Sequence, residues 1–245
     1  MLKMNRNRTL LLVGIIITSI LFFSERTIKI LFKDKVWAHR ANSIEKYIEA
    51  SSKFKGVELD VIFDDELNYF DVNHKPAISI HLSLLNYLMA EEIDSSFKFW
   101  IDFKNLTEQN QKQSFFRLDS IVQLMGLERN HFIIESKKPE YLSIFKEKGY
   151  KTSYYLPPGL HSLDSDSLNS VVEIIRKNIE WETTSYISAD CKNYRILKRH
   201  FPEHKKLLWM LGKAKYYRRI LLYNMLWDEK VDVVLITFNA KQGNR

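Results

Sequence analysis

The sequence has little cysteine and little glycine, and each shortage excludes a class of protein. Cys191 is the only cysteine among 245 residues, so the chain can form neither an intrachain disulfide nor a cysteine-based metal cluster. Seven glycines are too few for collagen-like sequence, repeats or long flexible linkers. Hydrophobic residues make up 45% of the chain, which is enough for a sizeable core. A chain of this length fits one large domain or two small ones.

Neither sign of charge is strongly in excess. The net charge is +7, and part of it lies at the N-terminus and between Lys205 and Arg219. A solvated helix face explains the second group best, and a nucleic-acid surface or an anionic membrane surface is the alternative. A nucleic-acid surface would need one continuous basic face with exposed aromatic residues, for which Tyr216 and Tyr217 are the candidates. We expect no nucleic-acid partner.

Only one long hydrophobic run is present, and it lies near the N-terminus. Residues 1–8 are polar and basic, and an apolar run follows them. This order is typical of an export signal, and the scarcity of small residues at its end favours an uncleaved anchor over a cleaved signal. We expect a cytoplasmic N-terminus at 1–8, a transmembrane signal anchor at 9–24, a linker at 25–34 and one domain at 35–245. The basic N-terminus predicts a single-pass membrane protein whose domain lies on the extracytoplasmic side.

From residue 35 onward, strand-like runs alternate with helix-like runs. Mostly apolar strands that alternate with amphipathic helices predict a parallel sheet in an α/β domain, and eight such units predict a TIM-type (β/α)8 barrel. An open doubly wound sheet is the alternative, but its usual glycine-rich first turn is absent after residues 36–38. The expected strands cover residues 36–38, 57–61, 97–103, 132–135, 151–155, 186–189, 206–210 and 231–236.

Two segments depart from a regular barrel. Residues 63–76 form an excursion between the second and third barrel strands, where we expect a small hairpin that brings His74 to the barrel mouth. The chain ends at Arg245, soon after the last strand, so we expect no full closing helix. Either residues 27–32, as a continuation of the membrane helix, or a partner should then cover the gap in the outer layer.

Charged side chains collect where the first three barrel strands end. The carboxylates of the second strand are two residues apart, so they point to the same face. Active sites of α/β barrels lie at these C-terminal strand ends. Burying this much charge costs roughly several kcal/mol for each group unless a partner or a metal ion compensates the charge. The residues are His39, Arg40, Glu58, Asp60, His74, Asp102 and Lys104.

This ordered set resembles a known family. Its His-Arg, Glu-x-Asp and later histidine are similar to the glycerophosphodiester phosphodiesterase group of the phosphatidylinositol-phospholipase-C-like barrels. The menorin group of the same superfamily is more similar still. Its opening His-x-x-Asn-Ser matches residues 39–43, and its Asp-Phe-Lys matches residues 102–104. The resemblance covers residues 36–104 and continues beyond them only as strand rhythm.

The sequence also departs from the phosphodiesterase pattern. Ala41 replaces the usual glycine after His-Arg, and Lys75 replaces the aspartate expected after the second histidine. The usual Glu-Asn-Thr is absent, although Asn42-Ser43 lies close to its place. These changes bear on activity and leave the expected fold unaffected.

A divalent cation is the expected cofactor. Oxygen ligands without cysteine suit a hard ion such as Mg²⁺ or Ca²⁺. Glu58 and Asp60 are the expected metal ligands of the second strand. The resemblance implies that Asp102 takes the place of a third-strand glutamate that ligates the metal in the family.

The expected chemistry is phosphodiester cleavage. Arg40 and Lys104 would neutralise phosphate charge beside the metal. His39 and His74 would act as general base and general acid, because histidine titrates near neutral pH. The resemblance implies that a hydroxyl of the substrate, next to the phosphate, attacks first.

Two further residues are expected to contact substrate, and two functions remain open. Trp209 matches the family's seventh-strand aromatic residue, and Asn42 follows His-Arg. The first function is a metal-dependent phosphodiesterase acting on a glycerophosphodiester-like, lipid-derived or envelope-derived diester, with a small molecule or a lipid head group as ligand. The alternative is a non-catalytic barrel of the same superfamily that binds a phosphorylated ligand or a protein partner.

Overall fold

The computed structural model describes residues 25–212 and 216–240. The predicted signal anchor at 9–24 and the basic segment before it lie outside these residues and stay predictions. Among the residues that are described, no helix is both long enough and apolar enough to cross a membrane.

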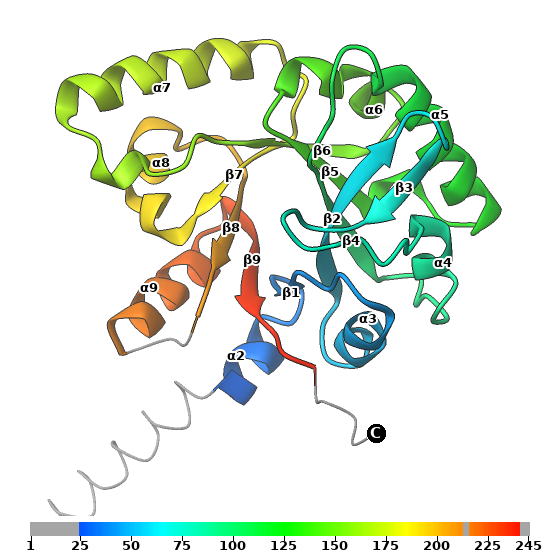
Figure 1. Ribbon diagram of the computed structural model, residues 1–245. Coiled ribbons are helices and arrows are strands. Elements are labelled where there is room, and N and C mark those ends of the chain that lie inside the picture. Colours follow the sequence, from blue (N-terminus) through cyan, green and yellow to red (C-terminus); the bar gives the residue numbers. More distant parts are fainter. Residues whose placement is uncertain (1–24, 213–215, 241–245) are drawn as a thin grey trace, which may run out of the picture.

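Eight parallel strands close into a barrel (Figure 1). Neighbouring strands pair in the order β1-β9-β8-β7-β6-β5-β4-β2, and a further pairing of β1 with β2, at Ala38 and Val57, closes the ring. The predicted TIM-type barrel is therefore confirmed, and the open sheet is excluded. The barrel strands are β1 (Val36–His39), β2 (Gly56–Asp64), β4 (Lys98–Phe103), β5 (Phe132–Ser136), β6 (Lys151–Tyr155), β7 (Tyr186–Asp190), β8 (Lys206–Met210) and β9 (Val231–Thr237).

Helices surround the barrel because their apolar faces pack against the outward side chains of the strands. Ser43, Ser83 and Asp164 cap the N-termini of α3, α4 and α7 with side-chain hydrogen bonds to backbone N–H groups. The helices are α2 (Glu25–Leu31), α3 (Ile44–Ser51), α4 (Leu84–Leu88), α5 (Gln111–Leu124), α6 (Ser143–Glu147), α7 (Ser165–Glu180), α8 (Tyr194–His200) and α9 (Tyr216–Trp227).

The expected hairpin between the second and third barrel strands is present. β3 (Tyr69–Val72) runs antiparallel to the end of β2, with Val61 opposite Val72 and Asp64 opposite Tyr69. The connection from β3 to α4 then extends toward the centre of the barrel, in front of β2 and β4 (Figure 1). This connection carries His74.

No helix follows β9 in the residues that the structure describes, up to 240, and other segments cover the outer layer between α9 and α3. The ring of Phe32, just after α2, makes edge contacts with Tyr223 and Trp227 of α9 at 6.1 and 5.2 Å between ring centroids. After β9, Phe238 packs edge-on against Phe54 at 5.4 Å. The predicted linker at 25–34 thus contains a helix that is part of the domain, with Ile28 buried in the core.

A small apolar cluster fills the inside of the barrel. β1 contributes Trp37 to this cluster, and the indole N–H of Trp37 donates to the Asp34 carbonyl at 3.0 Å. Gly56, at the start of β2, lies against the indole ring, so a Cβ atom there would come within 2.5 Å of a ring carbon. The cluster consists of Trp37, Trp100, Ile133, Leu207, Val233 and Leu235.

Gly56→Ala should therefore destabilise the barrel. A methyl group has no room beside a fixed indole, and overpacking of this kind costs about 1–3 kcal/mol in the free energy of unfolding. Chemical denaturation checks the loss. Trp37→Phe in the same chain should restore part of it, because the smaller ring leaves space for the methyl group. A Gly56→Ala variant as stable as wild type would show that the two residues do not contact each other as described.

Candidate functional site

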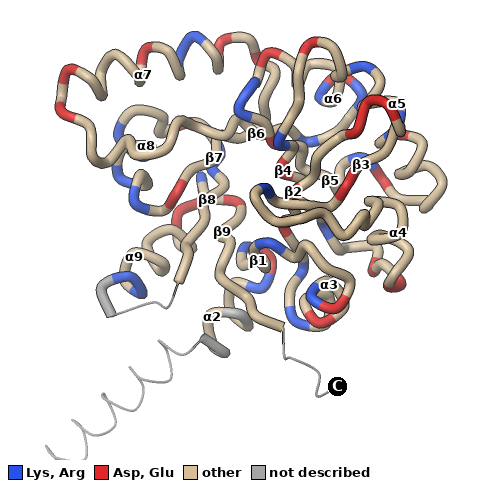
Figure 2. The backbone as a smooth tube through the Cα atoms, viewed as in Figure 1, with Lys and Arg blue, Asp and Glu red and all other residues tan. Residues whose placement is uncertain are grey.

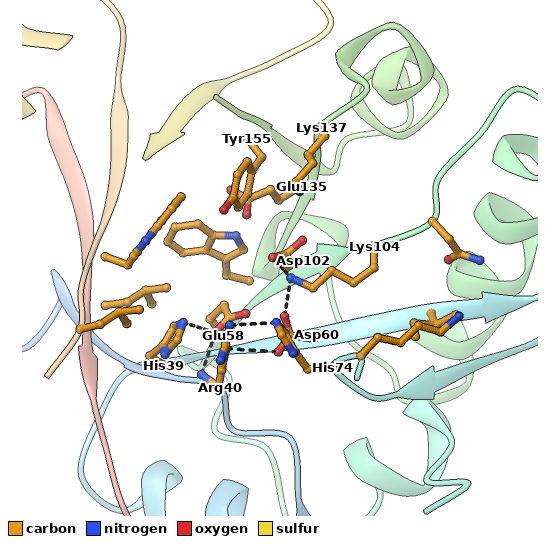
Figure 3. A pocket seen from close by; sticks show the side chains of 17 residues that line it. His39, Arg40, Glu58, Asp60, His74, Asp102, Lys104, Glu135, Lys137 and Tyr155 are labelled. Atoms are coloured by element: carbon orange, nitrogen blue, oxygen red, sulfur yellow. Dashed lines mark hydrogen bonds and ion pairs between the residues drawn. The ribbon is translucent and has the colours of Figure 1, made fainter. Parts of the chain in front are cut away.

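Strand register brings three carboxylates together at the C-terminal end of the barrel. Asp60 and Asp102 are direct partners on β2 and β4, and Glu58 precedes Asp60 on the same face of β2. One carboxylate oxygen of each lies within 4.8 Å of the others. Glu58 and Asp60 are only 3% and 1% exposed. They line a cavity of about 500 Å³ at the barrel mouth (Figure 3).

His39 ends β1 beside this cluster. Its Nε2 lies 3.6 Å from Oε2 of Glu58. Burial and the nearby Arg40 guanidinium lower the pKa of His39 to about 3, although Asp60 acts in the opposite direction. The imidazole is therefore neutral at pH 7 and can accept a proton.

The turn after β1 is held by two charged side chains. Arg40 has a left-handed backbone, with φ of 51°, and its N–H donates to Oε2 of Glu58 at 2.7 Å. The Lys46 ammonium, from α3, donates to the carbonyls of His39 and Arg40 at 3.0 and 2.5 Å. A non-glycine residue with this conformation needs such support, because a positive φ is strained for it.

Arg40 links the turn after His39 to the loop that carries His74. Its Nη2 lies 2.8 Å from Nε2 of His74, and its Nε lies 3.8 Å from Oδ2 of Asp60. A guanidinium only donates hydrogen bonds, so Nε2 of His74 is the acceptor and its ring proton is on Nδ1. The hairpin and the turn after β1 therefore meet directly at the site.

Lys104 lies between two of the carboxylates. Its ammonium is 2.5 Å from Oδ1 of Asp60 and also pairs with Asp102. Burial lowers the pKa of Lys104, but Asp102 and Asp60 together outweigh burial, so its pKa is raised above the ordinary value. Lys104 thus stays charged and neutralises part of the cluster.

The charged forms of Glu58 and Asp102 are disfavoured without a further cation. Burial raises the pKa of Glu58 well above its usual value, and the charges of Asp60 and Asp102 add to this. Burial also raises the pKa of Asp102 despite the nearby Lys104. Converging carboxylate oxygens whose charged forms need a cation fit Mg²⁺ or Ca²⁺. Glu58, Asp60 and Asp102 are the residues that could hold such an ion.

Of the two residues expected to contact substrate, Trp209 lines the cavity and Asn42 does not. Trp209 lines the cavity and packs against Tyr155 at 5.0 Å between ring centroids. Asn42 is bound to the protein itself, because its amide donates to Oδ2 of Asp60 at 2.6 Å and its carbonyl oxygen accepts from the Asp60 N–H at 3.0 Å. Asn42 therefore orients a carboxylate and is not among the residues that line the cavity.

Three further residues line the cavity for which the sequence predicted no role. Glu135 on β5 is 1% exposed and pairs in register with Asp102. Burial raises its pKa well above the usual value, and the Asp102 charge adds to this. Lys137 lies over the ring of Tyr155, 5.1 Å from its centroid. Their positions at or just after strand ends were the available signal, but no spacing connects them to the first three strands. In Figure 3, Glu135, Lys137 and Tyr155 lie across the cavity from His39 and Arg40.

The chain matches no protein-family model and no curated protein sequence. Solved structures with the same fold include a glycerophosphodiester phosphodiesterase from Parabacteroides distasonis, with 16% identity, a TM-score of 0.56 and coverage of 83% of this chain and 93% of that chain. A phosphodiesterase from Oleispira antarctica in complex with the product sn-glycerol-3-phosphate has 12% identity, a TM-score of 0.57 and coverage of 84% and 93%. A putative glycerophosphodiester phosphodiesterase from Galdieria sulphuraria has 14% identity, a TM-score of 0.57 and coverage of 82% and 93%. The resemblance found from the motifs is thus confirmed at the level of the fold.

Lys104→Met should expose the charge imbalance of the cluster. Asp60 and Asp102 would lose the ammonium between them, so the metal-free protein should lose about 3 kcal/mol of stability, the cost of breaking a buried pair. Mg²⁺ or Ca²⁺ should stabilise this variant more than wild type, because the ion no longer competes with Lys104. Thermal melts with chelator and with each ion check both effects, and Lys112→Met on α5 is the control. Equal ion effects in variant and wild type would contradict the competition.

Proposed function

We propose that this protein is a metal-dependent phosphodiesterase that cleaves a glycerophosphodiester-like or other lipid-derived or envelope-derived diester. The observation that carries the proposal is the convergence of Glu58, Asp60 and Asp102 on one pocket that His39 and His74 also line. The solved structures of the same fold support it, since they include phosphodiesterases and one holds a glycerol phosphate product.

The charged residues of the site suit a phosphodiester. Mg²⁺ or Ca²⁺, held by the three carboxylates, would supply positive charge that neutralises the phosphate oxygens and the developing negative charge. Arg40 adds a guanidinium that can bind two phosphate oxygens at once. Its side chain is 46% exposed, so it can turn from His74 toward a ligand. Lys104 adds a further positive charge on the β4 side.

The two histidines divide the proton transfers. Neutral His39 accepts the proton of the attacking hydroxyl, and Glu58, 3.6 Å away, stabilises the imidazolium that forms. His74 gives a proton to the leaving oxygen. When Arg40 moves to the phosphate, it frees Nε2 of His74, so that this nitrogen can face the leaving oxygen. With a substrate hydroxyl as nucleophile the first product is a cyclic ester, which water opens as the histidines exchange roles.

A second candidate function has one observation in its favour. Lys104 already neutralises Asp60 and Asp102, as a non-catalytic barrel that binds a phosphorylated ligand would require. Hydrolysis of glycerophosphodiesters, with Mg²⁺, Ca²⁺ or chelator in parallel, decides between the two. Phosphate-dependent stabilisation without any turnover would favour the binding barrel.

Glu58→Gln should abolish the effect of the metal and keep the fold. The variant removes a ligand charge, and it also removes a buried carboxylate whose charged form is disfavoured in the metal-free state. The metal-free protein should therefore melt at the wild-type temperature or slightly above it, and Mg²⁺ or Ca²⁺ should no longer raise the melting temperature. If neither ion moves the wild-type melt and no diester is cleaved, the catalytic proposal fails.

His39→Ala should separate catalysis from metal binding. The variant removes the proton acceptor and no ligand, so metal-induced stabilisation should remain while kcat falls by about 10²–10⁴-fold. Paired melts and hydrolysis assays measure both quantities. Loss of the metal effect in His39→Ala would show that the histidine holds the ion instead of moving a proton.

A further inference from the structure

Two isoleucine side chains beside the site are largely exposed to solvent. Ile78 is 93% exposed and Ile80 is 70% exposed, and both lie in the connection from β3 to α4. Exposed aliphatic side chains are common singly, but two in one short loop add apolar surface that water solvates poorly. Neither side chain lines the cavity.

The loop that carries them is built into the rim of the cavity. Its base is closed by a hydrogen bond from the Val72 N–H to the Leu82 carbonyl at 2.8 Å, and a turn follows His74, where the Ala77 N–H donates to the His74 carbonyl at 3.0 Å. His74 and Lys75 of this loop both line the cavity. The isoleucines are therefore held a few residues from a predicted catalytic group.

The loop itself carries charge of only one sign. No aspartate or glutamate occurs between residues 72 and 90, while Lys75 is exposed. Figure 2 shows blue and no red along this connection. Across the cavity, the exposed Lys137 adds a second cation. An apolar pair beside exposed cations matches a layer that is anionic at its surface and apolar below it, which is the structure of an anionic lipid bilayer.

We propose that Ile78 and Ile80 insert into an anionic lipid surface and that the site takes its substrate from that surface, as a diester that carries an acyl chain. In this arrangement the head group enters the cavity while the chain stays in the lipid beside the loop. The substrate class rests on the proposed function, whereas the lipid contact itself does not. A protein partner could also cover an apolar pair, and the experiment below separates that case.

The activity test compares one head group with and without an acyl chain. Full-length protein reconstituted in phosphatidylglycerol vesicles is given lysophosphatidylglycerol in the vesicles or glycerophosphoglycerol in solution. The double variant Ile78→Ser/Ile80→Ser should lose about tenfold or more in kcat/KM on the lipid, because two apolar anchors are removed, and should keep its rate on the soluble diester. Ile174→Ser on α7, whose side chain is 55% exposed, is the matched control. Equal rates of the double variant and wild type on the lipid would overturn the proposal.

The binding test needs no turnover. Cys191 is the only cysteine and is buried, so Ile78→Cys gives one accessible thiol for an environment-sensitive dye. The emission of the dye should shift to shorter wavelength in phosphatidylglycerol vesicles relative to phosphatidylcholine vesicles, and a dye at Ile174→Cys should not respond. Absence of the shift, or a changed oligomeric state of the serine variant with an unchanged dye signal, would contradict lipid insertion. If the dye shifts but neither diester is cleaved by wild type, the lipid contact stands and the proposed function fails.

Discussion

The site depends on how the charge of Asp60 and Asp102 is balanced inside the barrel mouth. Parallel strands place these carboxylates side by side in register, and burial makes their charged forms costly unless a cation lies between them. Lys104 supplies that cation directly after the end of β4, two residues beyond Asp102. Because the two residues are two positions apart in extended chain, both side chains point to the cavity side, and Lys104 neutralises the carboxylate of its near neighbour in the sequence.

Hydrogen bonds between the residues of the cavity and the turn after β1 make the site a single unit. Glu58 accepts a hydrogen bond from the Arg40 backbone and lies beside His39. Asn42 makes two hydrogen bonds to Asp60. Lys46 fixes the same turn from α3. Any ligand that binds the Glu58 carboxylate therefore also affects the hydrogen bond that holds the turn beside His39. This arrangement explains why carboxylates on β2 and a histidine on β1 keep their positions without a disulfide or a glycine at the turn.

Much of the fold and part of the site follow from the sequence, for physical reasons. The eight strands were predictable because apolar runs of strand length alternate with amphipathic segments, and the Glu58/Asp60 pair because a period of two fixes a shared face. The support of the turn by Lys46, the orienting role of Asn42 and the approach of Glu135 to Asp102 were not, because they depend on register between strands and on side-chain direction. Residues 27–32 were expected to cover the gap in the outer layer, and α2 with Phe32 lies there. That α2 belongs to the folded domain was not predictable, because it is short and is stabilised by Phe32 packing on α9, a contact distant in the sequence.

If residues 9–24 are a membrane anchor, the packing of α2 leaves the domain with almost no flexible linker. The predicted membrane run ends at residue 24, and the folded domain begins with α2 at Glu25, whose contacts run through Ile28 and Phe32. A chain anchored through residues 9–24 would thus hold the barrel within a residue or so of the bilayer, without the reach that a flexible linker provides. Such a protein could process only molecules in its own membrane or immediately next to it, and its working concentration of substrate would be set in two dimensions.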